Sequence, residues 1–82
     1  MCIKEYQDIK IFVKGEKFRT TYYPHFEVDY RGMLQAKFSF DLSILEGRLP
    51  ADVTIYVVNW AQRNCNLLKS EWESILNKKH IQ

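Results

Sequence analysis

Glycine, proline and cysteine are scarce in this chain, whose 82 residues contain three, two and two of them. Hydrophobic residues make up 46% of the chain and aromatic residues 15%. This apolar content, together with the small number of chain breakers, excludes a disordered chain. Cys2 and Cys65 form no C-x-x-C pair, and two cysteines are too few for a disulfide framework in so short a chain. We therefore expect one folded domain, residues 1–82, with free thiols in the reducing cytoplasm.

Long runs of one residue type are missing as well. No apolar run approaches the roughly 20 residues that cross a bilayer, and Lys4, Glu5 and Asp8 interrupt any signal-peptide pattern. Twelve basic and ten acidic side chains leave a formal net charge of +2, without the basic run that marks a phosphate-binding stripe. No glycine-rich phosphate loop is present. The sequence thus predicts no membrane association and no cofactor.

Alternating apolar and polar residues predict an antiparallel sheet in the first half of the chain. Arg31-Gly32 separates two alternating runs and is a turn signal, so these runs form a hairpin. The polar and then aromatic stretch from Glu16 to Tyr23 is expected to be a loop. Strands are expected at about residues 8–14, 25–30, 33–41 and 43–46.

The pattern changes at Leu49-Pro50, since proline suits the first turn of a helix. Residues 53–58 are β-branched and favour a strand by propensity, but a helical period of apolar residues continues towards the C-terminus. We predict one long helix at about residues 51–79, and whether it bends near Asn64-Asn66 stays open. The predicted fold class is α+β, a β-meander of three to four strands followed by this helix packed on one face.

The length of this helix raises a question about its second half. A straight helix over residues 51–79 spans about 43 Å, whereas strands of six to eight residues span roughly 20–27 Å. The overhanging part would leave an apolar patch in water, so the helix either bends back onto the sheet or pairs with another chain. We favour pairing, and the residues expected at that interface are Leu68, Trp72, Ile75 and Leu76.

Four segments, PHFEVDY, LEGRLP, NWA and SEW, occur in an order and at a spacing that resemble a family of small bacterial proteins, the domain of unknown function 4160. Members carry a Pro-Pro-His-Phe-His-Val strand, a Leu-x-Gly-x-Leu-Pro turn, and a helix with a Trp-Ala pair and a second Trp. The resemblance covers about residues 9–76. The matching elements here are Pro24–Val28, Leu45–Pro50, Trp60-Ala61 and Trp72.

The chain departs from this family pattern at three positions. Tyr23 replaces a proline, Glu27 replaces the second histidine of the strand, and Asn64 replaces a histidine of the helix. His25 alone remains of the family's histidines at these positions. Genes of this family often lie beside another small gene, so the resemblance implies one component of a toxin–antitoxin-like pair and a protein partner.

His25, Glu27 and Asp29 are the first candidate site. Side chains two residues apart on a strand lie on one face, roughly 6.5–7 Å apart, so an imidazole and two carboxylates can converge on a metal ion or act as acid and base. The same alternation is also the ordinary solvent face of a hairpin, with Lys37 as an ionic partner. We assign no metal site, and whether the protein is an enzyme stays open.

The loop from residue 17 to residue 23 is the second candidate surface. Lys17 and Arg19 offer positive charge, while Tyr22 and Tyr23 offer rings on which nucleic-acid bases can stack. Alternatively, the aromatic rings pack onto the body of the protein. Three hypotheses therefore remain: an interaction module that binds a protein partner or forms a homodimer, a small metal-dependent hydrolase or nuclease, and a weak nucleic-acid-binding domain.

Overall fold

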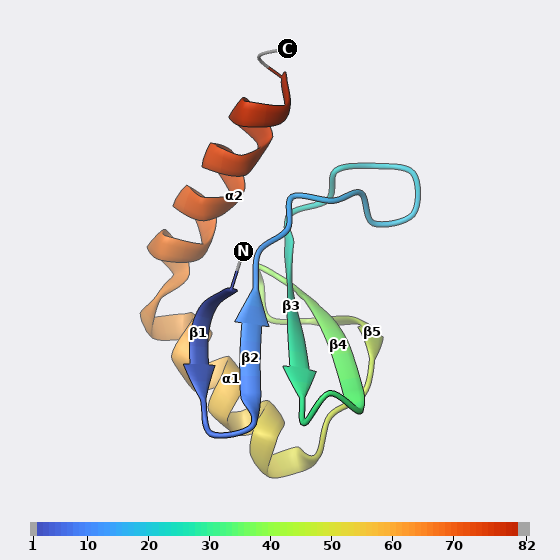
Figure 1. The fold of residues 1–82 in the computed structure, drawn as a ribbon, viewed down its shortest axis with the longest axis vertical. Helices are drawn as coiled ribbons and strands as arrows, with labels where there is room; N and C mark the ends of the chain where they lie inside the picture. The colour runs from blue at the N-terminus through green and yellow to red at the C-terminus, as the bar shows by residue number, and fades with distance from the viewer. Residues whose placement is uncertain (1, 81–82) are drawn as a thin grey trace.

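The structure, a computed structural model, describes residues 2–80, which form five strands and two helices (Figure 1). All five strands join one antiparallel sheet in the order β1-β2-β3-β4-β5. The α+β class and the meander are confirmed, while the predicted three to four strands are too few and the predicted single helix is divided in two. The elements are β1 (Cys2–Tyr6), β2 (Ile9–Phe12), β3 (His25–Tyr30), β4 (Leu34–Ser39), β5 (Ile44–Gly47), α1 (Ala51–Arg63) and α2 (Cys65–His80).

The predicted hairpin around Arg31-Gly32 is confirmed as β3 and β4, which pair in register from His25↔Ser39 to Tyr30↔Leu34. Arg31 and Gly32 have φ angles of 58° and 69°. Positive φ at both central residues is the requirement of a type I′ turn, whose twist matches that of the strands. The Gly32 amide donates to Asp29 Oδ2 at 2.9 Å, which fixes the turn further.

The sequence pattern does not predict β1. Its residues Cys-Ile-Lys-Glu-Tyr show no clear alternation, and the turn that follows has no glycine, although Gln7 adopts a φ of 51°. Pairing with β2, for example Glu5↔Lys10, makes this segment a strand. Strand formation depends on the neighbouring strand more than on intrinsic preference, so a short polar edge strand gives little signal.

The core lies between one face of the sheet and α1, which runs behind the sheet in Figure 1. Pro50 precedes this helix as predicted, and its carbonyl accepts hydrogen bonds from both the amide and the hydroxyl of Thr54. The other face of the sheet carries no helix in the described part of the chain. The buried apolar residues of the strands are Ile9, Ile11, Phe26, Val28, Ala36 and Phe38, and those of α1 are Val53, Val57, Trp60 and Ala61.

The second half of the helical region does not continue straight. α1 ends at Arg63, Asn64 leaves the helical conformation with φ −126° and ψ 26°, and α2 begins at Cys65. α2 passes beyond one end of the sheet (Figure 1) and covers the segment after β2. Ile75 lies so close to Gly15 that a side chain at residue 15 would collide with it. In the single chain the helix therefore bends back, one of the two alternatives that the sequence leaves open, and pairing with another chain stays a prediction.

Candidate functional site

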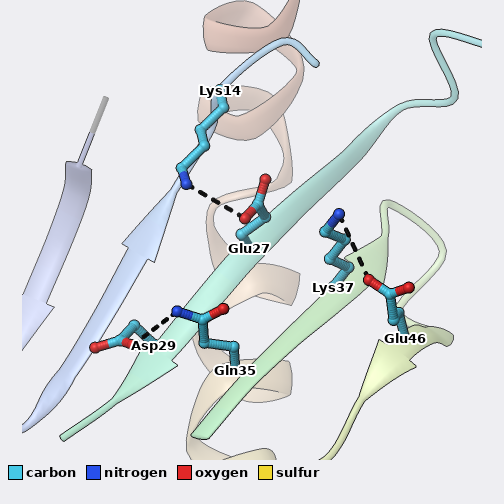
Figure 2. A network of polar contacts seen from close by, with 6 residues as sticks. All are labelled: Lys14, Glu27, Asp29, Gln35, Lys37 and Glu46. Carbon is cyan, nitrogen blue, oxygen red and sulfur yellow. Dashed lines mark hydrogen bonds and ion pairs between the residues drawn. The ribbon is translucent and has the colours of Figure 1, made fainter. Parts of the chain in front are cut away.

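Glu27 and Asp29 lie on the uncovered face of the sheet among polar partners (Figure 2). Lys14 Nζ is 3.5 Å from Glu27 Oε1, so this carboxylate has a partner from β2's continuation rather than the predicted Lys37. Lys37 instead pairs with Glu46 at 3.5 Å. Asp29 accepts a hydrogen bond from Gln35 at 3.4 Å in addition to the one from the β3–β4 turn.

The charges on this face alternate in sign across neighbouring strands. In one row, Lys10 stands between Glu5 and Asp29, and in the next row Lys37 stands between Glu27 and Glu46. Opposite charges on directly opposed residues stabilise a sheet modestly and cancel one another at a distance. This face therefore presents little net charge to a ligand.

His25 does not join the row of carboxylates, although it alternates with them in sequence. Its side chain is only 2% exposed, and its ring lies 5.4 Å from that of Trp72 and 6.0 Å from that of Phe18. Nδ1 lies 2.6 Å from the carbonyl oxygen of Tyr23, which can only accept, so Nδ1 donates. Among the described side chains, those of residues 2–78, no three His, Cys, Asp or Glu gather closely enough to hold a metal ion. The structure thus gives the acid–base or metal hypothesis no assembled cluster.

Three segments that are far apart in sequence meet beside His25 and form a groove. One hollow of about 220 Å³ is lined by Pro24, Phe40 and Trp72, with Lys69 and Glu73 at its rim. A second hollow of about 210 Å³ shares two of these residues and is lined by Tyr23, Pro24, Ser39, Phe40 and Asp41. We call these joined hollows the aromatic groove. It lies where β3 begins, β4 ends and α2 passes.

Edge-on ring packing holds the floor of the groove in place. Phe40 meets Trp72 at a ring distance of 6.1 Å and an angle of 83°, and it stacks on Phe26 at 6.3 Å. Such aromatic pairs add about 0.5–1.5 kcal/mol beyond the area that they bury. Phe26 belongs to the core under α1, so the groove floor is an extension of the core to the surface.

A polar turn forms the rim of the groove opposite α2. The Ser39 hydroxyl donates to the Asp41 carboxylate, and the Ser43 amide donates to Asp41 Oδ1 at 3.2 Å. These hydrogen bonds, from Ser39 first and then Ser43, lower the pKa of Asp41 below its ordinary value. A carboxylate with a lowered pKa is a poor base, so this Ser–Asp contact shapes the turn and keeps one negative charge at the groove.

The loop proposed as a nucleic-acid surface keeps its basic and aromatic residues paired. Lys17 lies over the ring of Tyr22 at 5.4 Å, and Arg19 lies over the ring of Phe18 at 5.4 Å. Tyr23 is 44% exposed and reaches the aromatic groove. Lys37 also approaches Phe18, at 5.8 Å, so positive charge gathers around this ring. Nucleic-acid binding by the loop stays a prediction.

The four residues predicted at an interface are directed into the protein's own interior. Leu68 is 1% exposed and Trp72 is 5% exposed, and Ile75 and Leu76 are partly buried against the same core. In this single chain they leave no large exposed apolar patch, because the break at Asn64 turns α2 onto the segment around Gly15. Their role at an interface with another chain stays a prediction. Trp72 still reaches the surface at one place, the aromatic groove.

Sequence reasoning missed Phe40 and Asp41 as site residues. Phe40 continues the apolar alternation of the predicted strand at residues 33–41, a pattern typical of a core residue, and its ring does contact Phe26. The available signal was the spacing of the segments that resemble a family, since Pro24 and Trp72 belong to two of them and meet at the groove.

The fold and groove define a small α+β protein with a meander sheet, a helix break and an aromatic surface hollow. The chain belongs to the family described as Domain of unknown function (DUF4160), whose model matches residues 9–73. This match confirms the resemblance inferred from the sequence. No curated protein and no solved structure matches the chain. In the described part of the chain, no helix is long and apolar enough to cross a membrane.

Proposed function

We propose that this chain is a protein-interaction module and that its aromatic groove holds a short apolar segment of a second protein. The observation that carries the proposal is the meeting of Pro24, Phe40 and Trp72 in one apolar surface hollow. Tryptophan and other aromatic residues in such hollows are frequent anchors of protein interfaces. At about 220 Å³ the hollow is smaller than pockets for drug-sized ligands, which favours one or two side chains of a protein.

The rim of the groove supports the same proposal. Asp41 stands on one side, and Lys69 and Glu73 stand on the other. Neither α2 side chain takes part in the ion pairs found among the described residues, so their charges are available to a partner. An apolar centre enclosed by polar residues is the usual anatomy of a protein interface.

The finer proposal is that the partner is encoded by a neighbouring small gene, as in a toxin–antitoxin-like pair. It rests on the gene arrangement that the family resemblance implies. We also propose the cytoplasm as the location, because both cysteines are free and exposed, which suits a reducing compartment.

The test is binding of the neighbouring gene's product, measured by titration calorimetry, together with capture of partners from the native host. Phe40→Ala removes the ring that both hollows share and is expected to weaken binding about 30-fold or more, as loss of an interface anchor does. Ile44→Ala is the matched control, because Ile44 is apolar and 51% exposed but lies on β5 outside the groove.

The outcomes separate the two levels of the proposal. Failure of the neighbouring product to bind rejects the gene pair, while groove-dependent capture of another host protein keeps the module. Equal affinity of Phe40→Ala and wild type, in a variant shown to be folded, rejects the groove as the binding surface. Lys69→Glu repeats the test at the rim without removing any part of the floor.

A further inference from the structure

The connection between α1 and α2 is a single residue, and its hydrogen bonds imitate those of a continuous helix. In an uninterrupted helix the Asn64 amide would donate to the carbonyl of Trp60. Here that amide donates to Ala61 at 3.2 Å, and the Asn64 side chain reaches back to the Trp60 carbonyl at 2.8 Å. The Asn64 carbonyl already accepts from Leu68 at 3.1 Å, as in a helix. Only the conformation of residue 64 separates the two helices from one.

The apolar residues on the two sides of this break lie in phase. Placed on one helix at 100° per residue, they fall within about 160° of the wheel, so no residue has to be inserted or removed to make a single stripe. This stripe consists of Val53, Val57, Trp60 and Ala61 in α1 and of Leu68, Trp72, Ile75 and Leu76 in α2. The apolar stripe therefore fits one continuous helix as well as it fits two.

The contacts that hold α2 can be made by either copy of a dimer. Trp72 packs on His25 and Phe40, and Ile75 packs on Gly15. All three contacted residues lie before the helical region, in the sheet and its loops. A continuous helix over residues 51–80 would be about 45 Å long, longer than the 40 Å of the whole molecule, and would carry α2 away from its own sheet.

We propose that two copies of this chain exchange α2. In the dimer, the Asn64 break closes into a continuous helix, and Trp72 of each copy packs on His25 and Phe40 of the other. The same contacts form in monomer and dimer, so the balance depends on residue 64 and on protein concentration. Exchange between two identical copies closes on itself with two-fold symmetry.

This exchange has a consequence for the aromatic groove, although it holds whether or not the groove binds a partner. Pro24 and Phe40 would come from one copy, and Lys69, Trp72 and Glu73 from the other. Each groove would then be complete only in the dimer or in the closed monomer. An opened single chain would lose the hollow that Trp72 lines and keep only the residues of the second hollow.

The experiment compares wild type, Asn64→Ala and Asn66→Ala after refolding from urea at high concentration. Both variants replace asparagine by a better helix former, but only residue 64 is non-helical in the closed chain, and only its side chain supports the break. Molar mass is measured by light scattering from about 10 µM to about 1 mM. Asn64→Ala is expected to lower the dimer's dissociation constant by about tenfold, whereas Asn66→Ala leaves it near the wild-type value.

Exchange itself is read from isotope-filtered NMR on a mixture of labelled and unlabelled copies. Contacts between Trp72 of one copy and Phe40 of the other are expected in the dimer. The proposal is overturned if wild type and Asn64→Ala both remain monomeric throughout, if a dimer forms without these intermolecular contacts, or if Asn66→Ala shifts the equilibrium as much as Asn64→Ala. Because wild type is itself measured, misfolding of one variant does not remove the test.

Discussion

The two helices carry one apolar stripe but rest on different supports. α1 lies across the centre of the sheet (Figure 1), and its residue Val57 is fully buried. Many strand residues therefore hold this helix. α2 lies past the end of the sheet and rests on a few large contacts at Gly15, His25 and Phe40. Segments held by few buried contacts open at lower free energy than those in the central core. We therefore expect α1 to unfold with the sheet, and α2 to detach before it.

Trp72→Ala is expected to have the largest effect on the difference in stability between α1 and α2. Removing a buried tryptophan costs about 3–5 kcal/mol when the structure remains intact, and Trp72 makes the ring contacts of α2 with His25 and Phe40. Hydrogen exchange followed by NMR should show rapid exchange of amides in α2, while amides in α1 stay protected. Equal loss of protection in both helices would mean that they form one cooperative unit.

Gly15→Ala is expected to have the next largest effect, about 2 kcal/mol in the free energy of unfolding, measured by urea denaturation. Its φ of 65° is unfavourable for alanine, and the added methyl group would meet the side chain of Ile75 in α2. Gly32→Ala is the matched control. Gly32 has a similar φ of 69° but open space around it, so it should lose only the conformational part, about 1 kcal/mol.

If Gly15→Ala lowers the free energy of unfolding less than Gly32→Ala does, Ile75 does not contact this segment closely. A larger loss localises the difference to the contact between α2 and the chain after β2. The pair of variants therefore measures how closely α2 packs on the segment around Gly15, separately from backbone strain.

The smallest expected effect concerns the charge at the groove rim. The hydrogen bonds from Ser39 and Ser43 lower the pKa of Asp41 in the folded protein below its ordinary value of 3.8. Their stabilising contribution is therefore present above that pH and is lost as the pH falls through the lowered value. Asp41→Asn should flatten the acid limb of a stability–pH profile recorded by thermal unfolding. An unchanged acid limb would show that these bonds do not favour the charged form.

The elements that sequence reasoning found are those whose signals are local. The hairpin from His25 to Ser39 has clean alternation and a turn with glycine where positive φ is needed, and α1 follows Pro50. β1 could not be predicted, because pairing with β2, rather than its own sequence pattern, makes it a strand. The path of α2 stayed open between bending back and pairing with another chain. A stripe in phase does not reveal a one-residue break, whose effect depends on tertiary contacts.

The candidate site shows the same division. Glu27 and Asp29 were correctly placed on the open face, because alternation determines which face a strand residue takes. His25 shares their alternation but lies at the first position of β3, where Trp72 and Phe18 cover it. The alternation within a strand does not reveal that a helix and a loop distant in sequence cover one of its residues. The aromatic groove, which joins three segments, could be found only in three dimensions.

The strictly sequential order of the strands has a kinetic consequence. Each strand pairs with the next one along the chain, so nearly every contact in the sheet closes a short loop. Proteins rich in such local contacts fold faster than those built from distant pairings. The longest connection within the sheet, residues 13–24, adds little, since each doubling of a loop's length costs only about 0.6 kcal/mol. We expect the meander to form early, before α2 packs against the rest of the chain.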